Sequence, residues 1–386
     1  MLHVLHSRSA RLCLPLFLMA CGDAQERTQS DAGALLPADG STADSGSPSA
    51  GRDASTAADA ALDANSSALD GALDATGSDA RVDQPDAAGS DASADTGAMA
   101  APDAGMQPIP APVADDCITN VSAGDHSFTC SGLTFLVKVE EQCTKFACGL
   151  IFDVHGGTMG GKQMRDNTKL HELAPKHGFI VVHPSATPEP TGGSWDLMAD
   201  PPKIVDFFKR VAKAFHTDPK RHHVTGFSQG SAVTFFFLCN HSDLLASAAP
   251  VSGNSANTTC INAAWKPRVP FLFMNGISDT ALTIENANMR VDTMVRELAL
   301  TGGTQVAGDG HFTRKRWTGP EGMELDYIVH DYGGQAVLGG HCIPGGSDIP
   351  GSANNFVLNA TTCTTGEIKL HWGETALEYF LAHPKR

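Results

Sequence analysis

The stretch HHVTGFSQGSAVTFFFLCN, residues 222–240, decides the fold of this chain. An apolar run ends at Phe227, Ser228 follows it directly, and a second apolar run begins after Gly230. This order of strand, tight turn and helix is the setting in which a serine side chain projects from the edge of a sheet. Gly226 and Gly230 leave out the side chains that would collide in so sharp a turn. We therefore predict that Ser228 is a nucleophile.

On both sides of this stretch, short apolar runs alternate with longer helical patterns. Apolar residues recur at helical spacing between residues 204 and 215 and again between residues 287 and 300. Such alternation is typical of an α/β fold, with a mostly parallel central sheet flanked by crossover helices. The runs are short, bounded and mostly apolar, as expected for strands buried on both faces. The predicted interior strands are residues 150–155, 179–183, 223–227, 270–275 and 325–330.

A serine hydroxyl is a weak nucleophile at neutral pH, so Ser228 needs a base and a group that orients the base. In this setting the acid and then the histidine follow the serine along the chain. Asp279 lies just past the predicted strand 270–275, where the ligand-facing loops of a parallel sheet belong. His341 lies in the glycine-rich loop GGHCIPGG. We predict Asp279 and His341 as the partners of Ser228. The competing residues are His311, His330, His371, Asp326 and Asp331, of which His330 and Asp331 are expected to serve structure.

The oxyanion that forms on an attacked carbonyl needs two hydrogen-bond donors. The backbone N–H of Gln229, directly after the serine, is expected to be one of them. The segment IFDVHGGTMGG, residues 151–161, has a His-Gly-Gly arrangement from which Gly157 or Thr158 would supply the other. His155 is expected to be a buried, hydrogen-bonded spacer. A phosphate-binding loop is the alternative, but the Walker lysine with Ser or Thr is missing and no GxGxxG occurs here.

The first 21 residues predict an export signal. Two arginines precede the apolar run LCLPLFLMA, which is too short to span a bilayer, and Cys21 follows it. The ending LMAC resembles the lipobox of bacterial lipoproteins, in which the cysteine is lipidated. Ordinary secretion with cleavage near Ala20 is the alternative. Both predict an extracytoplasmic protein, either anchored to the bacterial cell envelope through a lipid on Cys21 or secreted.

Residues 22–116 predict a disordered acidic linker. They contain 3 basic and 18 acidic residues, which gives −15 of the net charge of −16, and no Lys, Cys, Phe, Trp or Tyr. Such a composition cannot bury enough apolar surface to offset chain entropy. Calcium binding by the aspartates is the alternative, but no window matches an EF-hand loop. Residues 117–386 are nearly neutral and have the size of one catalytic domain, so we expect no nucleic-acid partner.

Eight cysteines remain beyond the predicted signal and Cys21, an even number that suits an oxidising compartment. No CxxC pair occurs, so a zinc site is not expected. Eight cysteines allow many pairings, and nearness along the chain favours four of them. The favoured pairs are Cys117 with Cys130, Cys143 with Cys148, Cys239 with Cys260, and Cys342 with Cys363.

Five motifs follow one another between about residue 149 and residue 384. They are VHGG (154–157), DPKRHHVTGFSQGS (218–231), ASAAPVSG (246–253), NGISDTAL (275–282) and GGHCIPGG (339–346). In this order they resemble the extracellular polyhydroxybutyrate depolymerases and feruloyl esterases of the α/β-hydrolase superfamily, the esterase depolymerases. The resemblance implies an α/β-hydrolase fold. It also gives Ser228, Asp279 and His341 the triad roles, and Gln229 with Gly157 or its neighbour the oxyanion hole.

The chain departs from this family in its last motif, which usually reads GGHTWPG. Cys342 and Ile343 stand here in place of the Thr-Trp pair, so an aromatic wall beside the site is missing and a disulfide is expected to pin the loop. Trp195, in GGSWDL, matches a family position often occupied by tryptophan. Its apolar body and single N–H suit it to flank a bound ester, and packing as part of a lid is the alternative.

These features predict a serine esterase that works by two-step acyl transfer without a metal or an organic cofactor. The predicted substrate is a polyester such as polyhydroxybutyrate. Feruloyl or acetylxylan-type esters on a polysaccharide are the alternative. A peptidase with the same triad and a non-catalytic surface lipoprotein that kept the fold for binding are further alternatives. The sequence leaves the oligomeric state open.

Overall fold

The structure is a computed structural model of the 386-residue chain. It describes residues 106–186, 192–253, 268–333, 338–346, 363 and 367–386. All of these belong to one compact unit, Ser90–Arg386. The predicted signal with Cys21, the linker up to residue 105, and Cys260 lie outside the described residues.

The described residues contain a ten-stranded sheet in the order β1-β2-β4-β3-β5-β6-β7-β10-β9-β8. The central strands from β4 to β10 are parallel, and the pairs toward both edges are antiparallel. This confirms the predicted α/β-hydrolase arrangement with a mostly parallel central sheet. The strands are β1 Gly124–Cys130, β2 Leu133–Val139, β3 Gly149–Val154, β4 Phe179–Ser185, β5 His222–Phe227, β6 Ser247–Val251, β7 Phe271–Gly276, β8 Thr301–Gly308, β9 Phe312–Thr318 and β10 Glu324–His330.

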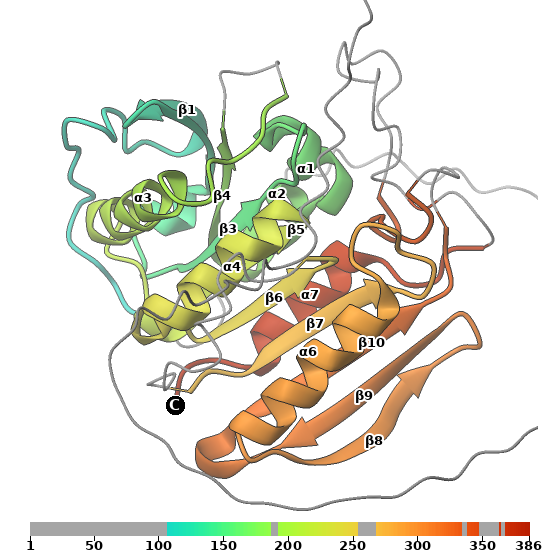
Figure 1. The fold of residues 1–386 in the computed structure, drawn as a ribbon. Helices are drawn as coiled ribbons and strands as arrows, with labels where there is room; N and C mark the ends of the chain where they lie inside the picture. Colours follow the sequence, from blue (N-terminus) through green and yellow to red (C-terminus); the bar gives the residue numbers. More distant parts are fainter. Residues whose placement is uncertain (1–105, 187–191, 254–267, 334–337, 347–362, 364–366) are drawn as a thin grey trace, which may run out of the picture. The chain divides into compact units, whose positions relative to one another are not determined.

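Helices cover both faces of the sheet, and each face has its own hydrophobic core (Figure 1). On one face lie α3 (Asp200–Ala214), α4 (Gln229–Asn240) and α6 (Ile284–Glu297). On the other lie α1 (Gly161–Thr168), α2 (Leu170–Leu173) and α7 (Trp372–Ala382). The short 3-10 helices are η1 Glu141–Thr144, η2 Ala174–His177, η3 Pro219–Arg221, η4 Ser242–Leu244 and η5 Pro320–Gly322.

The five predicted strands correspond to β3, β4, β5, β7 and β10, with ends within one or two residues of those expected. Every residue of β3, β5 and β7 is buried, because helices cover both faces of the central sheet. The predicted helices over 204–215 and 287–300 correspond to α3 and α6. Among the described residues, no helix combines the length and the apolar character needed to cross a membrane.

The predicted linker ends earlier than expected, because residues 106–116 contact the domain. The backbone N–H of Ile109 donates to Lys145 O at 3.0 Å. The N–H of Val113 donates to Ala214 O at 2.9 Å. Arg210 binds the carboxylates of Asp115 and Asp116. The boundary expected at residue 117 thus follows a stretch that already contacts the domain, and the three prolines and two aspartates of this stretch gave no sign of these contacts.

The structure joins three of the four cysteine pairs that nearness along the chain favoured. Their Cα atoms are 5.8 Å apart in Cys117–Cys130, 5.3 Å in Cys143–Cys148 and 5.1 Å in Cys342–Cys363. Cys239 is disulfide-bonded as well, while Cys260, its expected partner, lies outside the described residues. The first two bonds link segments at the start of the domain, and the third holds the loop that carries His341.

Candidate active site

Ser228 occupies the tight turn between β5 and α4. Its backbone has φ 54° and ψ −113°, a conformation that residues with a side chain rarely adopt. The turn requires glycine on either side, because a Cβ at Gly226 would collide with the backbone of Gly230. A Cβ at Gly230 would in turn collide with the carbonyl of Val154. The N–H of Ser228 donates to Val251 O at 2.9 Å, which ties the strained turn to β6.

Asp279 and His341 form a buried hydrogen-bonded pair. The Nδ1–H of His341 donates to Asp279 Oδ2 at 2.9 Å, and the two residues are 6% and 4% exposed. The other carboxylate oxygen, Oδ1, accepts the N–H groups of Ala281 and Leu282, both at 2.8 Å. The carboxylate is therefore fixed in place. With its Nδ1 proton donated to Asp279, the imidazole keeps Nε2 for a second partner.

The fold brings this pair to the edge of the sheet where Ser228 lies. Asp279 follows β7, which runs parallel to β5 with β6 between them. The ring of His341 packs against that of Phe227, the residue before the serine, with centroids 4.7 Å apart. The loop of His341 reaches this position because Gly339 pairs with Asp279. Ser228 and Asp279 thus both follow the carboxyl ends of parallel strands, and His341 contacts Asp279 and the residue before Ser228.

The competing acids are engaged elsewhere. Asp326 accepts hydrogen bonds from Arg314 at 2.6 Å and from Arg316 at 2.7 and 2.8 Å. Asp331 pairs with His311 at 3.1 Å on the surface, where both side chains are about half exposed. Asp279 is accordingly the candidate acid that contacts the predicted base.

His330 and His155 are unsuited to act as the base. Burial lowers the pKa of His330 to about 4. His371 is the exposed N-cap residue of α7, and its side chain makes no cap hydrogen bond. His155 donates from Nδ1 to Gly156 O at 2.6 Å and accepts the Ala186 N–H at Nε2 at 3.1 Å. Burial also lowers the pKa of His155 to about 4. His155 is thus a neutral imidazole with both nitrogens engaged, as expected of a spacer.

The His-Gly-Gly loop after β3 passes directly over the serine. A Cβ at Gly156 would lie 2.9 Å from the Phe227 ring and 3.2 Å from Ser228 Cβ. A Cβ at Gly157 would lie 3.1 Å from the side-chain amide of Gln229. Thr158 turns the loop with φ 64°. Gly157 and Gln229, two of the residues predicted for the oxyanion hole, therefore lie beside each other at the turn of Ser228.

Trp195 has a different role from the substrate contact expected for it. Its side chain is 4% exposed and stacks on His155, with ring centroids 4.4 Å apart. The indole N–H donates to His155 O at 2.8 Å, so it is no longer available to a substrate. These contacts show Trp195 as a packed residue of its loop, while the lid role given as the alternative stays a prediction. Ile343 is likewise fully buried, in the core on the α7 face.

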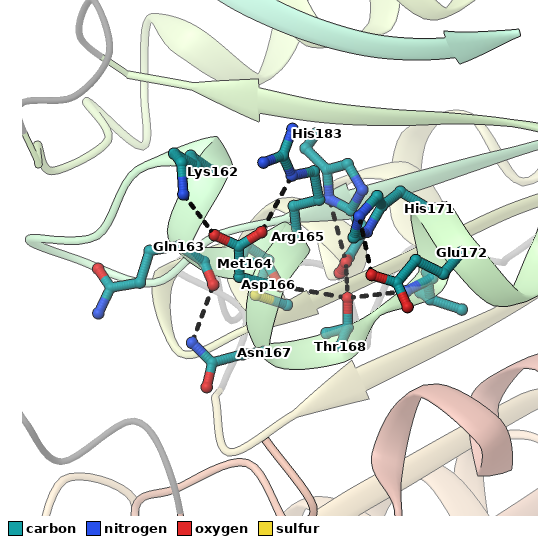
Figure 2. Close-up of polar contacts among 12 residues, drawn as sticks. Lys162, Gln163, Met164, Arg165, Asp166, Asn167, Thr168, His171, Glu172 and His183 are labelled. Atoms are coloured by element: carbon teal, nitrogen blue, oxygen red, sulfur yellow. Dashed lines mark hydrogen bonds and ion pairs between the residues drawn. The ribbon is translucent and has the colours of Figure 1, made fainter. Parts of the chain in front are cut away.

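A buried polar network that sequence analysis missed joins α1, β3 and β4 (Figure 2). Asp153, fully buried in β3, accepts the hydroxyl proton of Thr168 on α1 at 2.5 Å. His183 of β4 lies 3.2 Å from the same carboxylate oxygen. The ring of His171 faces His183 edge-on at 6.1 Å. A carboxylate inside the apolar run IFDV is the sequence signal that could have predicted such partners.

A cavity of about 810 Å³ lies near the amino ends of β6, β7 and β10, at the sheet edge opposite Ser228. Arg314, Arg316 and Glu324 line it, and the two arginines are paired with Asp326. Within the described parts of the chain, no cluster of three or more His, Cys, Asp or Glu side chains is arranged to hold a metal ion.

No family model matches this chain. It is 29% identical over 139 residues to the bifunctional acetylxylan esterase/xylanase XynS20E of Neocallimastix patriciarum, covering 35% of this chain and 20% of that protein. It is 26% identical over 135 residues to feruloyl esterase B of Piromyces equi, covering 33% and 25%. Over 131 residues it is 27% identical to the probable acetylxylan esterase A of Aspergillus clavatus, covering 30% and 42%. The chain thus spans between a fifth and about two fifths of these relatives' lengths.

Two solved structures that resemble the chain are also named as esterases. An acetyl xylan esterase from Aspergillus awamori gives a TM-score of 0.45 at 17% identity, covering 54% of this chain and 93% of that one. A carboxylesterase from Mesorhizobium loti gives 0.41 at 13% identity, covering 67% and 99%. The relatives in sequence are named as esterases, which agrees with the predicted class of carboxylic ester hydrolase. The chain is similar to acetylxylan and feruloyl esterases, whereas its resemblance to polyhydroxybutyrate depolymerases stays a prediction.

Proposed function

We propose that this chain is a serine esterase that removes acyl groups, acetyl or feruloyl, from an esterified polysaccharide. The observation that carries the proposal is the hydrogen bond between His341 and Asp279 beside the strained turn of Ser228. The local sequence similarity to acetylxylan and feruloyl esterases favours this substrate class over the polyester first expected.

In the first step, the Ser228 hydroxyl attacks the ester carbonyl while Nε2 of His341 takes its proton. The Asp279 carboxylate holds the imidazole through Nδ1 and stabilises the imidazolium that forms. The backbone N–H groups of Gln229 and of Gly157 or Thr158 stabilise the oxyanion. The imidazolium then gives the proton to the sugar oxygen as the tetrahedral intermediate collapses and the bond between the acyl carbon and that oxygen breaks, so the sugar leaves with a free hydroxyl. In the second step, water attacks the acyl-enzyme with His341 again as the base, which releases the acid and the free serine.

The test of the nucleophile is the rate of p-nitrophenyl acetate hydrolysis by Ser228→Ala. We expect kcat to fall at least about a thousand-fold, because the attacking oxygen is removed. Ser231→Ala is the matched control, since Ser231 lies one turn further along the same helix and its buried hydroxyl has no hydrogen-bond partner among the residues that the structure describes. Its activity should stay near that of the wild type. Wild-type rates in Ser228→Ala would refute the proposal.

The substrate class is tested by offering the wild-type protein acetylated xylan, methyl ferulate and polyhydroxybutyrate film side by side. We expect release of acetate or ferulate that Ser228→Ala abolishes. Release of hydroxybutyrate without either of these products would favour the polyester substrate and contradict the polysaccharide proposal.

The location of the protein is proposed separately from its chemistry. The disulfides of the domain suit an oxidising compartment, which supports export. Attachment to a membrane through a lipid on Cys21 is part of the same proposal. Intact-mass analysis of the mature protein tests it, because lipidation adds the mass of the acyl chains to a chain that begins at Cys21. An unmodified mass with cleavage near Ala20 would contradict the anchor.

A further inference from the structure

The side chain of Gln229 connects three segments that are far apart in sequence. Its Oε1 accepts the backbone N–H of Trp195 at 3.0 Å. The indole N–H of Trp195 donates to His155 O at 2.8 Å, and its ring stacks on the imidazole of His155. A chain of contacts therefore runs from the residue after the nucleophile, through Trp195, to the residue that opens the His-Gly-Gly loop.

The same loop is fastened at two further points. The N–H of Gly193 donates to Met159 O at 2.9 Å, and these two residues form an isolated β-bridge. The N–H of Ala186 donates to His155 Nε2 at 3.1 Å. Gly193 and Ala186, which both precede Trp195 in the chain, thus also hold the loop, and the Trp195 side chain is 4% exposed.

The side chain of Gln229 also lies between the turn of Ser228 and the His-Gly-Gly loop. Its side-chain amide lies where a Cβ at Gly157 would be 3.1 Å away, so the amide packs directly against that glycine. The backbone N–H of Gln229 is positioned by the start of α4. The second donor, on Gly157 or Thr158, lies in a loop with a positive φ and depends on neighbouring contacts for its position. Oxyanion stabilisation requires both donors in place before the reaction begins.

We propose that Gln229, Trp195 and His155 form a positioning clasp that holds the second oxyanion donor over the nucleophile. This inference rests on the proposed esterase function. The clasp side chains act through the backbone of the loop and do not touch the reacting atoms. They should therefore affect the transition state, in which the oxyanion exists, much more than the bound substrate, in which it does not.

Two variants each remove one contact of the clasp while keeping most of the side-chain volume. Gln229→Met keeps the length of the side chain and removes the oxygen that accepts the Trp195 N–H. Trp195→Phe keeps an aromatic ring beside His155 and removes the indole N–H together with part of the bicyclic ring. Met198→Ala is the control, because Met198 lies three residues beyond Trp195 with a side chain that is 84% exposed. For each variant we would measure kcat and KM with p-nitrophenyl acetate, the melting temperature, and inhibition by a trifluoromethyl ketone.

The clasp predicts that kcat falls about ten- to a hundred-fold in both variants, with KM within about twofold. The affinity for the ketone, whose serine adduct carries an oxyanion, should fall by the same factor as kcat/KM. The proposal would be overturned by an unchanged kcat in folded variants or by a change in KM alone. A lower kcat with unchanged affinity for the ketone would overturn it as well. If one variant does not fold, the other decides the question. Wild-type protein that hydrolyses no ester would instead refute the proposed function, so the two failures are distinguishable.

Discussion

The strained backbone of Ser228 depends on glycines that no other residue can replace. Gly230 allows α4 to start directly beneath β3, because its missing side chain lets the backbone of Val154 approach. The helix and the N–H bond of Ser228 to Val251 then hold φ at 54°. The backbone conformation of Ser228 is thus stabilised by the packing around it. Added side-chain atoms at the neighbouring glycines would disturb this packing.

Gly230→Ala should lower the free energy of unfolding by about 2 kcal/mol or more, because the added methyl collides with backbone atoms that cannot move independently. Esterase activity should fall with it. Gly310→Ala is the control: its φ is 97°, with open space around a Cβ, so only backbone strain of about 1 kcal/mol is expected. Urea unfolding measures both. Equal losses in the two variants would contradict the collision at Gly230.

At the scale of elements, α1 is joined to the sheet by the buried network around Asp153. Thr168 at the end of α1 donates its hydroxyl to this carboxylate, and His183 approaches it from the neighbouring strand (Figure 2). The strand that holds Asp153 continues into the His-Gly-Gly loop. The position of that loop therefore depends on a charged group that is fully buried and needs its partners.

Thr168→Val should destabilise the protein by about 2 to 4 kcal/mol, since it leaves a buried carboxylate without one of its hydrogen bonds. Thr293→Val is the matched control on α6, because its hydroxyl donates to Met289 O at the solvent-exposed side of that helix. We expect the control to change stability by less than about 0.5 kcal/mol. Chemical denaturation of the two variants measures the difference, and similar values for both would contradict a role for the network.

At the scale of the whole molecule, several histidines are buried as neutral groups across the sheet. Burial lowers the pKa of His155, His222 and His330 to about 4 each. These residues lie after β3, in β5 and in β10, so their protonation is linked to the stability of the whole sheet. The ordinary histidine pKa is about 6.5, so the folded protein holds fewer protons than the unfolded chain between the two values.

Stability should therefore fall as the pH decreases from about 6.5 to about 4, because the unfolded chain takes up protons that the folded protein excludes. Each of the three histidines contributes up to about 3 kcal/mol to this loss, which is complete below about pH 4. The free energy of unfolding measured across this range tests the expectation. His330→Phe should make the slope shallower, and a stability that is constant over the range would contradict it.

Much of this arrangement could be predicted from the sequence. Five of the six parallel strands could be predicted, because burial on both faces demands mostly apolar runs. The sixth, β6, was missed, because its sequence SAAPV is short and contains serine and proline. β8 and β9 were missed as well, since β8 is exposed along nearly its whole length and β9 carries the run TRKRWT. Ser228, Asp279 and His341 could be chosen from chain order and glycine context. The clasp could not, because it depends on side-chain contacts between loops for which no periodic pattern exists.

The central claim is that the hydroxyl of Ser228 is made nucleophilic by His341, held by Asp279. The measurement that tests it most directly is the rate of modification by a fluorophosphonate, followed by peptide mass spectrometry. We predict one adduct, on Ser228, that forms rapidly in the wild type and at least about a thousand-fold more slowly in a folded His341→Ala variant. An adduct on another residue, or equal rates in the two proteins, would contradict the account.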